Sequence, residues 1–199
     1  MGIKEKYIQY AEISDDLMYG RLCLKVGIPW ITPGSFRYLL DVIEPDWKVF
    51  EWGSGGSTVF WANNCAEVVS IEHNKDWITR VTGMLKGAKN VDLRYVRGKP
   101  KGVKDRFRHY ADVINEYPDE YFDLVFNDGE ASSRGWALNN SMPKIKIGGY
   151  LLLDNSSWLK RDISKEGFEF IGEWVERNLH WIGQRNPFNW ETAIYRRME

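Results

Sequence analysis

The sequence predicts an α/β domain that is doubly wound around a mostly parallel seven-stranded sheet and ends in an antiparallel strand pair. From Trp47 onward, short apolar runs alternate with helical or loop stretches, a pattern that implies right-handed crossovers and parallel strands. The chain has 199 residues, and we expect residues 1–199 to form one domain. The NPFNW segment before the last run is too brief for a crossover, so the last two strands should be antiparallel neighbours.

Residues 1–46 show a helical pattern, and residues 47–199 carry the sheet. The clearest early helix is TPGSFRYLLDVI, in which Thr32 can cap the N-terminus and Pro33 suits the first turn. Apolar side chains recur on one face of this helix, at Phe36, Leu39, Leu40 and Ile43. A helix with one apolar face needs a sheet to cover.

Seven apolar runs predict the strands, and the stretches between them predict the helices. The strands are expected at WKVFEW, AEVVSIE, VDLRYV, YFDLVFND, GYLLLDN, HWIGQ and ETAIYRR. Helices are expected at Thr58–Asn64, Trp77–Lys86 and roughly Arg134–Lys146. A last crossover helix is expected to bury Phe168, Ile171, Trp174 and Val175.

Composition argues against several classes of protein. The formal net charge is -1, from 27 Lys and Arg against 28 Asp and Glu, so the overall balance argues against a nucleic-acid partner. The apolar runs fall far short of a membrane span and the charged N-terminus has no apolar signal segment, so we expect a cytoplasmic protein without a membrane partner. Cys23 and Cys65, with no CxxC and no His cluster, indicate two reduced, packed thiols.

The most informative segment is VFEWGSGGSTVFWA, where a strand ends near Glu51 and a glycine turn leads into a helix that opens at Ser57 or Thr58. In an open parallel sheet, a ligand sits off the carboxyl ends of the strands, where a helix N-terminus offers free N–H groups. A plain structural turn is the alternative. Glu72 closes the next strand 21 residues after Glu51. There a carboxylate can accept hydrogen bonds from both hydroxyls of a ribose, unless it is simply a solvated strand-end acid.

Two further strands, FDLVFNDG and GGYLLLDN, each end in an acid at the same predicted edge. Asp128 ends one strand, and Asp154 followed by Asn155 ends the other. Neighbouring strands lie about 4.8 Å apart, so the three side chains can converge. Two carboxylates and an amide oxygen suit Mg²⁺ rather than zinc. The alternative is that these side chains cap the following loops.

Together, these motifs resemble the sequential motifs of class I S-adenosylmethionine (SAM)-dependent methyltransferases over roughly residues 47–158. The resemblance implies a Rossmann-like fold, SAM as the cofactor, and an N-terminal helical segment that caps the substrate site. The frequent third glycine of the turn is replaced by Ser57, which an amino acid with a sulfonium tolerates. The cofactor-binding residues implied by the resemblance are Glu51, Gly53, Ser54, Gly55, Ser57, Thr58, Glu72, His73 and Asp128.

Within that superfamily, the set Asp128, Asp154 and Asn155 is similar to the metal ligands of cation-dependent O-methyltransferases typified by catechol O-methyltransferase. The similarity implies that Asp128 and Asp154 are catalytic and that Mg²⁺ assists methyl transfer to a hydroxyl of a small molecule or sugar. Those enzymes commonly place a lysine base three positions after the first ligand, where this chain has Ala131. Either another group removes the proton, or the acids serve the fold.

Two tryptophans and one basic loop are weaker signals of a substrate. Trp30 and Trp158 fall in predicted loop or segment-end positions, where they can stack on a sugar or aryl ring of the acceptor. Core packing is the default reading for most of the other tryptophans. The run RGKPKGVKDRFRH concentrates positive charge on one loop, which is either solvated or meets a phosphorylated or acidic substrate.

Two other functions use similar motifs. An NAD-dependent oxidoreductase also needs a glycine turn and a ribose acid, but Thr58 stands where G-x-G-x-x-G has its third glycine. The chain is also too short for the substrate domain of such an enzyme. A non-catalytic nucleoside-binding module on the same fold stays open, because the sequence identifies no proton acceptor.

Overall fold

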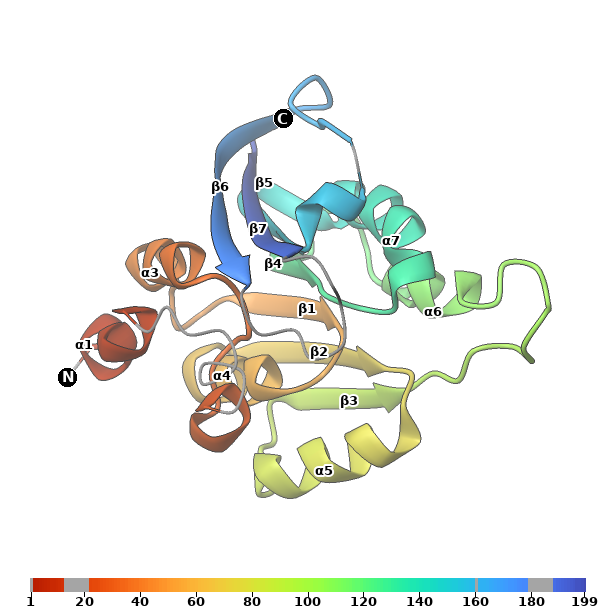
Figure 1. Cartoon of the computed structure of the whole chain (residues 1–199), viewed down its shortest axis with the longest axis horizontal. Coiled ribbons are helices and arrows are strands. Elements are labelled where there is room, and N and C mark those ends of the chain that lie inside the picture. Colours follow the sequence, from red (N-terminus) through yellow and green to blue (C-terminus); the bar gives the residue numbers. More distant parts are fainter. Residues whose placement is uncertain (1, 13–21, 160, 179–187) are drawn as a thin grey trace.

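The computed structural model describes residues 2–12, 22–159, 161–178 and 188–199. A seven-stranded sheet in the order β3-β2-β1-β4-β5-β7-β6 forms its centre (Figure 1). Strands β3, β2, β1, β4 and β5 are parallel, and β7 is antiparallel to both of its neighbours. The predicted sheet class is confirmed.

The bounds of the elements are as follows. The strands are β1 (Lys48–Trp52), β2 (Glu67–Glu72), β3 (Val91–Tyr95), β4 (Phe122–Asn127), β5 (Ile145–Asp154), β6 (Phe168–Asn178) and β7 (Phe188–Arg197). The helices are α1 (Ile3–Tyr7), α3 (Pro33–Val42), α4 (Gly56–Asn64), α5 (Lys75–Leu85), α6 (Arg108–Asp112) and α7 (Arg134–Ser141). Short 3₁₀ turns are η1 (Ile8–Glu12), η2 (Val113–Glu116), η3 (Ala131–Ser133), η4 (Met142–Lys144) and η5 (Ser156–Trp158).

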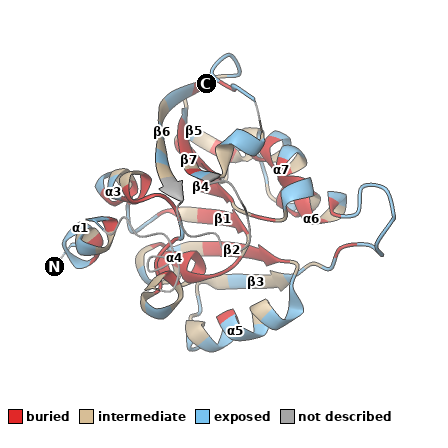
Figure 2. Ribbon diagram, in the orientation of Figure 1, coloured by how far each residue is buried: buried red, intermediate tan, exposed pale blue. Residues whose placement is uncertain are grey.

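Helices cover both faces of the sheet, because alternate residues of the central strands bury side chains on opposite sides. One apolar cluster joins Val49 and Leu124 to α1, α3 and α4. The other joins Phe50 and Val125 to α6 and α7. Figure 2 shows the central strands as the buried part of the sheet, with β3 and β6 at its more exposed edges. This burial on both faces explains why apolar residues occupy successive positions in the central strands instead of alternating with polar ones.

The helix predicted from TPGSFRYLLDVI is confirmed as α3. Pro33 opens it, and Phe36, Leu39 and Leu40 are buried against the sheet. Thr32 occupies the N-cap position without a capping hydrogen bond; its hydroxyl donates to Ser35 Oγ, 2.9 Å away. The helix therefore forms through its apolar face rather than through a side-chain cap.

The predicted crossover helix around Phe168 is wrong, because this segment is strand β6. A bulge between Phe170 and Gly172 shifts the strand register by one residue. Ile171 and Trp174, three residues apart, therefore both pack toward the cluster that holds α3, while Phe168 belongs to the opposite cluster. This spacing imitates a helical face. The strand predicted at HWIGQ, residues 180–184, lies outside the described residues, and the antiparallel pair is β6 with β7.

The helix predicted over Arg134–Lys146 is too long. Helix α7 ends at Ser141, and a 3₁₀ turn that contains Pro143 leads into β5 at Ile145. Proline lacks the N–H that a continuing helix would need.

The predicted packing of the cysteines is confirmed: Cys23 and Cys65 are buried thiols that form no disulfide. In the described part of the chain, no helix is long and apolar enough to cross a membrane.

Candidate active site

The glycine turn between β1 and α4 brings three parts of the chain together. Gly53 has φ +89°, and a Cβ there would lie 2.5 Å from the carbonyl oxygen of Asp128. A Cβ on Gly56 would lie 2.3 Å from the carbonyl oxygen of Cys23. Among the residues that the structure describes, a Cβ on Gly55 would meet nothing closer than Trp77, at 3.9 Å. The first two glycines therefore allow close backbone packing, whereas Gly55 has room for a side chain within this part of the chain.

Glu51 lies beneath this turn and is completely buried. Its Oε1 accepts hydrogen bonds from the hydroxyls of Thr58 and Ser70, and its Oε2 accepts one from Trp61 Nε1 at 2.9 Å. Burial raises the pKa of Glu51 to about 7, although these hydrogen bonds lower it. The Glu51 side chain thus connects the first turn of α4 to β1 and β2 by hydrogen bonds. It has no exposed surface, so Glu51 can affect a bound cofactor only by holding the glycine turn in position.

Glu51 predicts that the protein loses stability as the pH rises. The folded chain retains a proton on Glu51 up to about pH 7, whereas the unfolded chain releases it near the usual pKa of 4.5. Stability therefore falls between these values, and Glu51 alone should cost about 2 to 3 kcal/mol between roughly pH 5 and 8. Urea unfolding at the two pH values measures this loss. Glu51→Gln should abolish this part of the pH dependence of stability, whereas Glu67→Gln, at the start of the neighbouring strand β2, should leave it unchanged. An equal loss of stability between the two pH values in the wild-type protein and both variants would refute the prediction.

Glu72 joins the end of β2 to the glycine turn. Its Oε2 accepts hydrogen bonds from Ser54 N at 3.0 Å and Ser54 Oγ at 3.1 Å. Its Oε1 accepts from the backbone N–H groups of His73 and Asn74, at 2.8 and 2.7 Å. These four donors fill the lone-pair positions of the carboxylate. A ribose can bind here only by replacing one of them, and the Ser54 hydroxyl is the one that is free to rotate.

An aromatic wall stands beside Glu72. The ring of His73 lies 5.4 Å from Phe107 and 5.8 Å from Tyr110, nearly perpendicular to both. Tyr110 is fully buried and donates a hydrogen bond to the carbonyl oxygen of Ile71. A Cβ on Gly129 would lie 2.7 Å from the Tyr110 hydroxyl. These rings thus connect the end of β2 at Glu72 to the loop after β4, and both ribose binding by Glu72 and adenosine packing on His73 remain predictions.

Arg134 joins the ends of β4 and β5. Its Nη2 lies 2.8 Å from Asp128 Oδ1, and its Nη1 donates to the carbonyl oxygen of Asp154. Its Nε donates to the carbonyl oxygen of Gly129 at 3.0 Å. The Asp154 carboxylate accepts hydrogen bonds from Trp190 Nε1 and Thr192 Oγ1 on β7. The two predicted acids therefore do meet at one edge, with a guanidinium as their cation.

The two carboxyl groups favour a shared proton. Burial raises the pKa of Asp128 to about 6, while Arg134 and a hydrogen bond with Asp154 lower it. Burial and the charge of Asp128 raise the pKa of Asp154 well above its usual value. Asp128 keeps 31% of its side chain exposed, whereas Asp154 is buried. Asp128 is therefore the member of the pair that an acceptor can reach.

The residues at this edge do not fit a divalent cation. Arg134 already supplies positive charge to Asp128, and the donors on β7 occupy Asp154 Oδ1. Asn155 adopts the left-handed conformation with φ 49°, and its backbone carbonyl accepts a hydrogen bond from Trp158 N. Among the described residues, no group of three or more His, Cys, Asp or Glu is placed to hold a metal ion. Mg²⁺ has no support from this geometry.

Both predicted substrate tryptophans lie near this edge and are exposed. Trp158 is 59% exposed, and the guanidinium of Arg134 lies 5.1 Å from the centre of its ring. Trp30 is 48% exposed. The backbone just after Trp30 is anchored by Thr32 N, which donates to Thr192 Oγ1, the same hydroxyl that donates to Asp154. Contact of either tryptophan with an acceptor remains a prediction.

Sequence reasoning missed Arg134, although its helix carried a signal. The buried residues of α7 are Arg134, Ala137, Leu138 and Ser141. Their spacing is that of one helix face, which places an arginine among residues that face the core. A buried arginine requires acceptors, and the nearby acids Asp128 and Asp154 are the obvious candidates.

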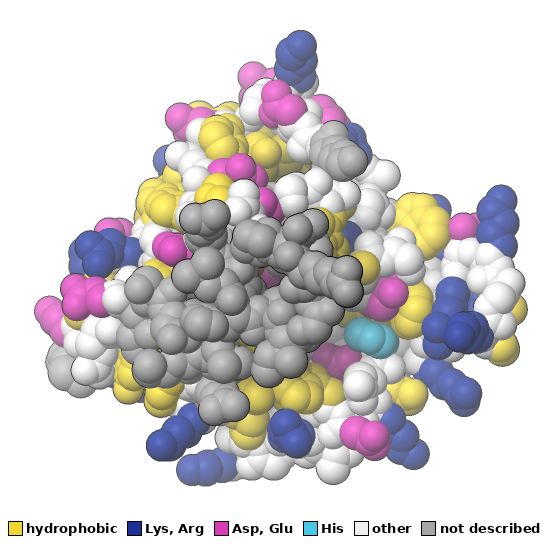
Figure 3. All heavy atoms as spheres, viewed as in Figure 1, with side chains coloured by type: hydrophobic (Ala, Val, Ile, Leu, Met, Phe, Trp, Pro, Cys, Tyr) yellow, Lys and Arg dark blue, Asp and Glu magenta, His cyan; other side chains and the backbone are white. Residues whose placement is uncertain are grey.

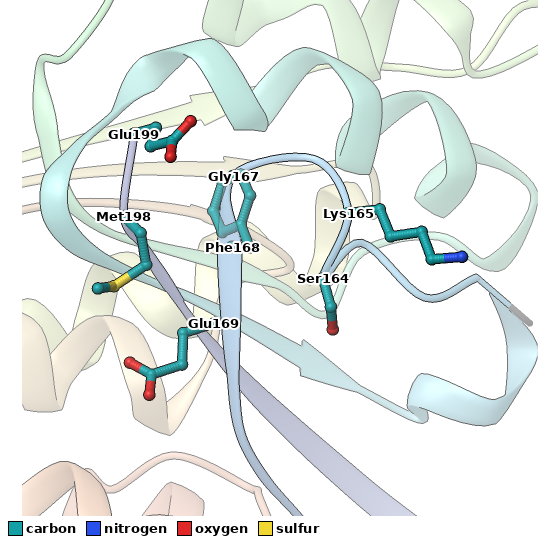
Figure 4. A pocket seen from close by; sticks show the side chains of 7 residues that line it. All are labelled: Ser164, Lys165, Gly167, Phe168, Glu169, Met198 and Glu199. Carbon is teal, nitrogen blue, oxygen red and sulfur yellow. The ribbon is translucent and has the colours of Figure 1, made fainter.

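A shallow hollow of about 300 Å³ lies elsewhere on the molecule (Figure 4). It is lined by Ser164, Lys165, Gly167, Phe168, Glu169, Met198 and Glu199. Phe168 pairs with Arg197 at the end of β7, whereas Asp154 pairs with Thr192, five residues earlier in the same strand. The hollow therefore lies at the edge of the sheet opposite the acids and the glycine turn.

Comparison with known proteins supports the fold through structure alone. No protein-family model and no curated protein sequence matches the chain. An rRNA methylase from Streptococcus thermophilus is 15% identical with a TM-score of 0.59, over 83% of this chain and 95% of its own. A methyltransferase candidate from Streptococcus mutans, solved in complex with SAH, is 14% identical with a TM-score of 0.58, over 82% and 96%.

Not every protein with this fold is named for methyl transfer. The [4+2]-cyclase SpnF is 13% identical to this chain with a TM-score of 0.56, over 79% of this chain and 76% of its own. The fold of the chain is that of the class I SAM-dependent methyltransferases, as its motifs indicate. Identities at this level establish the fold, and the activity must be argued from the site.

Proposed function

We propose that this protein is a SAM-dependent methyltransferase that methylates a hydroxyl group, on a small molecule or a sugar. The contact between Glu72 and Ser54, beside the open face of Gly55, carries this proposal. This contact supports the proposal because it holds a carboxylate that is suited to a ribose next to a glycine turn, on the edge of the sheet where this fold binds ligands. The turn lacks the third glycine of a dinucleotide site, so the arrangement suits one adenosine with an amino-acid tail.

The chain offers a distinct group for each part of SAM. Glu72 would bind the ribose hydroxyls after the Ser54 hydroxyl turns away. The first turn of α4, which begins at Gly56, offers free N–H groups to the carboxylate of the methionyl tail. His73 would pack against the adenosine at the aromatic wall. Such positioning of the reactants supplies much of the rate acceleration in methyl transfer.

Asp128 is the proton acceptor in this proposal. Its carboxylate is partly exposed at the edge of the sheet, next to the buried Asp154, and its pKa is raised to about 6. A base whose pKa lies near the working pH is well suited to take the proton from an acceptor hydroxyl. Arg134 keeps Asp128 in place and favours its ionised form. Because these groups do not fit Mg²⁺, we propose proton transfer to Asp128 rather than metal activation.

Calorimetry with S-adenosylhomocysteine (SAH) and with NADH tests the cofactor. We expect SAH to bind and NADH not to bind. Glu72→Ala should weaken SAH binding by about 2 to 3 kcal/mol, since it removes the charge-assisted hydrogen bond that the carboxylate makes to the ribose once the Ser54 hydroxyl has turned away. Glu67→Ala changes the other end of the same strand and should leave the affinity unchanged. NADH binding without SAH binding would overturn the assignment, and an unchanged affinity in Glu72→Ala would mean that the ribose lies elsewhere.

A nucleoside-binding module without catalytic activity is the alternative. Transfer of a radiolabelled methyl group from SAM to a broad panel of acceptors separates the two functions. If SAH binds and no acceptor is methylated, the result favours the binding module.

A further inference from the structure

The charge of the chain is divided unevenly, although its sum is close to zero. Residues 75–108 contain eleven Lys or Arg and three Asp, a net charge of +8. The rest of the chain therefore carries -9, which gives the overall -1. The positive part comprises α5, β3 and the loop 96–107, which are consecutive along the chain and adjacent at one edge of the sheet. We call the exposed Lys and Arg of residues 75–108 the basic face.

Most cations of the basic face lack carboxylate partners. Within the described residues, only Arg94 and Arg108 of these eleven form ion pairs, with Asp92, Glu116 and Asp112. Cations elsewhere more often have partners, as at Lys4, Lys48, Arg134, Lys144, Lys146 and Arg161. Figure 3 shows Lys and Arg side chains gathered along the margin of the molecule over α5 and this loop. Their positive charge is therefore available to an external anion.

The loop 96–107 is joined at its base to the candidate active site. Lys99 N donates to the carbonyl oxygen of Arg106, and Arg106 Nε donates back to that of Lys99, so the loop closes on itself. At its base, Val96 N donates to the carbonyl oxygen of Glu72, and Phe107 packs on His73. The base of the loop thus adjoins the proposed ribose site, and the rest of the loop extends outward from the sheet (Figure 1).

An exposed aromatic ring lies among the cations of the basic face. Tyr95 ends β3 and is 42% exposed, between Arg94 and Arg97 along the chain. Aromatic rings beside a basic groove are the usual platform for unpaired nucleobases, since every base has a face that can stack. An acidic protein or an anionic membrane would use the positive charge but would not need the ring.

We propose that the basic face binds single-stranded RNA and that this RNA carries the acceptor hydroxyl. Phosphates would contact Lys99, Lys101 and Lys104, and a base would stack on Tyr95. A nucleotide further along the strand would then enter the edge at Asp128, because β2 and β1 lie between β3 and β4. This inference rests on the proposed methyltransferase function and replaces its small acceptor with a ribose hydroxyl of RNA. The net charge conceals such a surface, because the acidic residues lie in the rest of the chain.

Fluorescence anisotropy with a labelled RNA of about 15 nucleotides tests the surface. Binding should weaken steeply as the salt concentration rises between about 50 and 200 mM. The triple variant Lys99→Ala, Lys101→Ala, Lys104→Ala should lower the slope of log affinity against log salt by about 2 and weaken binding about ten- to a hundredfold. Tyr95→Ala should weaken binding about tenfold without changing the slope.

A control variant separates local from overall charge. Lys6, Lys25 and Lys165 are exposed and lie outside the basic face; replacing all three with Ala removes the same charge and should leave RNA binding almost unchanged. Equal losses in the two triple variants would overturn the proposal, as would no RNA binding at about 50 mM salt. Tighter binding to phosphatidylserine vesicles or polyglutamate than to RNA would also overturn it. Since a triple variant can misfold, thermal unfolding checks that each variant is folded. The single variant Lys101→Glu, which reverses one charge of the basic face, should also weaken RNA binding.

The cofactor is measured separately, so that the two proposals can fail independently. SAH binding without RNA binding would contradict the RNA surface alone. RNA binding without SAH binding would contradict the methyltransferase function instead. Transfer of labelled methyl groups to RNA, and not to DNA of the same sequence, is expected if the acceptor is a ribose hydroxyl, because DNA lacks the 2′-hydroxyl. Equal transfer to both would contradict a 2′-hydroxyl acceptor.

Discussion

Gly55→Val is expected to abolish SAH binding while leaving the fold intact. The backbone at Gly55 is extended, with φ 168°, so a side chain there causes no strain. The nearest atoms to an added Cβ belong to Trp77, at 3.9 and 4.0 Å. The valine methyl groups would therefore occupy the space beside the turn that the described residues leave free, which is where we place the cofactor. Calorimetry should show a loss of at least about a hundredfold, roughly 3 kcal/mol, with an unchanged melting temperature.

The neighbouring glycine provides the matched control. A Cβ on Gly56 would lie 2.3 and 2.4 Å from the carbonyl oxygens of Cys23 and Ile28. Both are backbone atoms that cannot turn aside, so Gly56→Ala should destabilise the fold by several kcal/mol, of the order of 3. Normal SAH binding by Gly55→Val would show that the turn is only structural.

The sequence predicts best where one residue pattern has one physical solution. Leu151, Leu152 and Leu153 belong to a strand buried on both faces, and such a strand appears as an uninterrupted apolar run. The carboxyl ends of parallel neighbours meet at one edge, which is why Asp128 and Asp154 could be placed together before their contacts were known. The contact between Ser54 and Glu72 follows from the same rule.

The errors arise where a single feature alters the pattern. The bulge at Ile171 changes the spacing of buried residues in β6, so that a strand resembles a helix. Arg134 was overlooked because charged residues are expected at the surface, whereas α7 buries it among carbonyl and carboxylate oxygens. Without a cation from the protein, the acid pair appeared to require a metal ion. Net charge, as a single sum, also conceals the division between residues 75–108 and the rest.

Arg134→Met is expected to destabilise the protein by about 3 kcal/mol, and by as much as roughly 5, because it leaves buried acceptors without their donor. Three interactions disappear together: the ion pair with Asp128 and the hydrogen bonds to the carbonyl oxygens of Gly129 and Asp154. Methionine has a similar length, so the loss reflects charge and hydrogen bonding more than volume. Urea unfolding at neutral pH measures this free energy. The stability of Arg134→Lys should lie between those of the wild-type protein and Arg134→Met, since one ammonium group cannot reach all three acceptors at once.

The same variant separates a structural role for Arg134 from a role in tuning the acid pair. Arg134 lowers the pKa of both Asp128 and Asp154, so its removal should raise them and shift the alkaline-rising limb of methyl transfer to higher pH. In the background of Asp128→Asn, the stability cost of Arg134→Met should shrink, because the carboxylate that needs the guanidinium is gone. An equal cost in both backgrounds would mean that the ion pair contributes nothing.

Full activity of the wild-type protein in excess chelator is expected, since Arg134 supplies the positive charge at this edge. Activity that vanishes with chelator and returns with Mg²⁺ would show that a metal ion displaces Arg134 during catalysis.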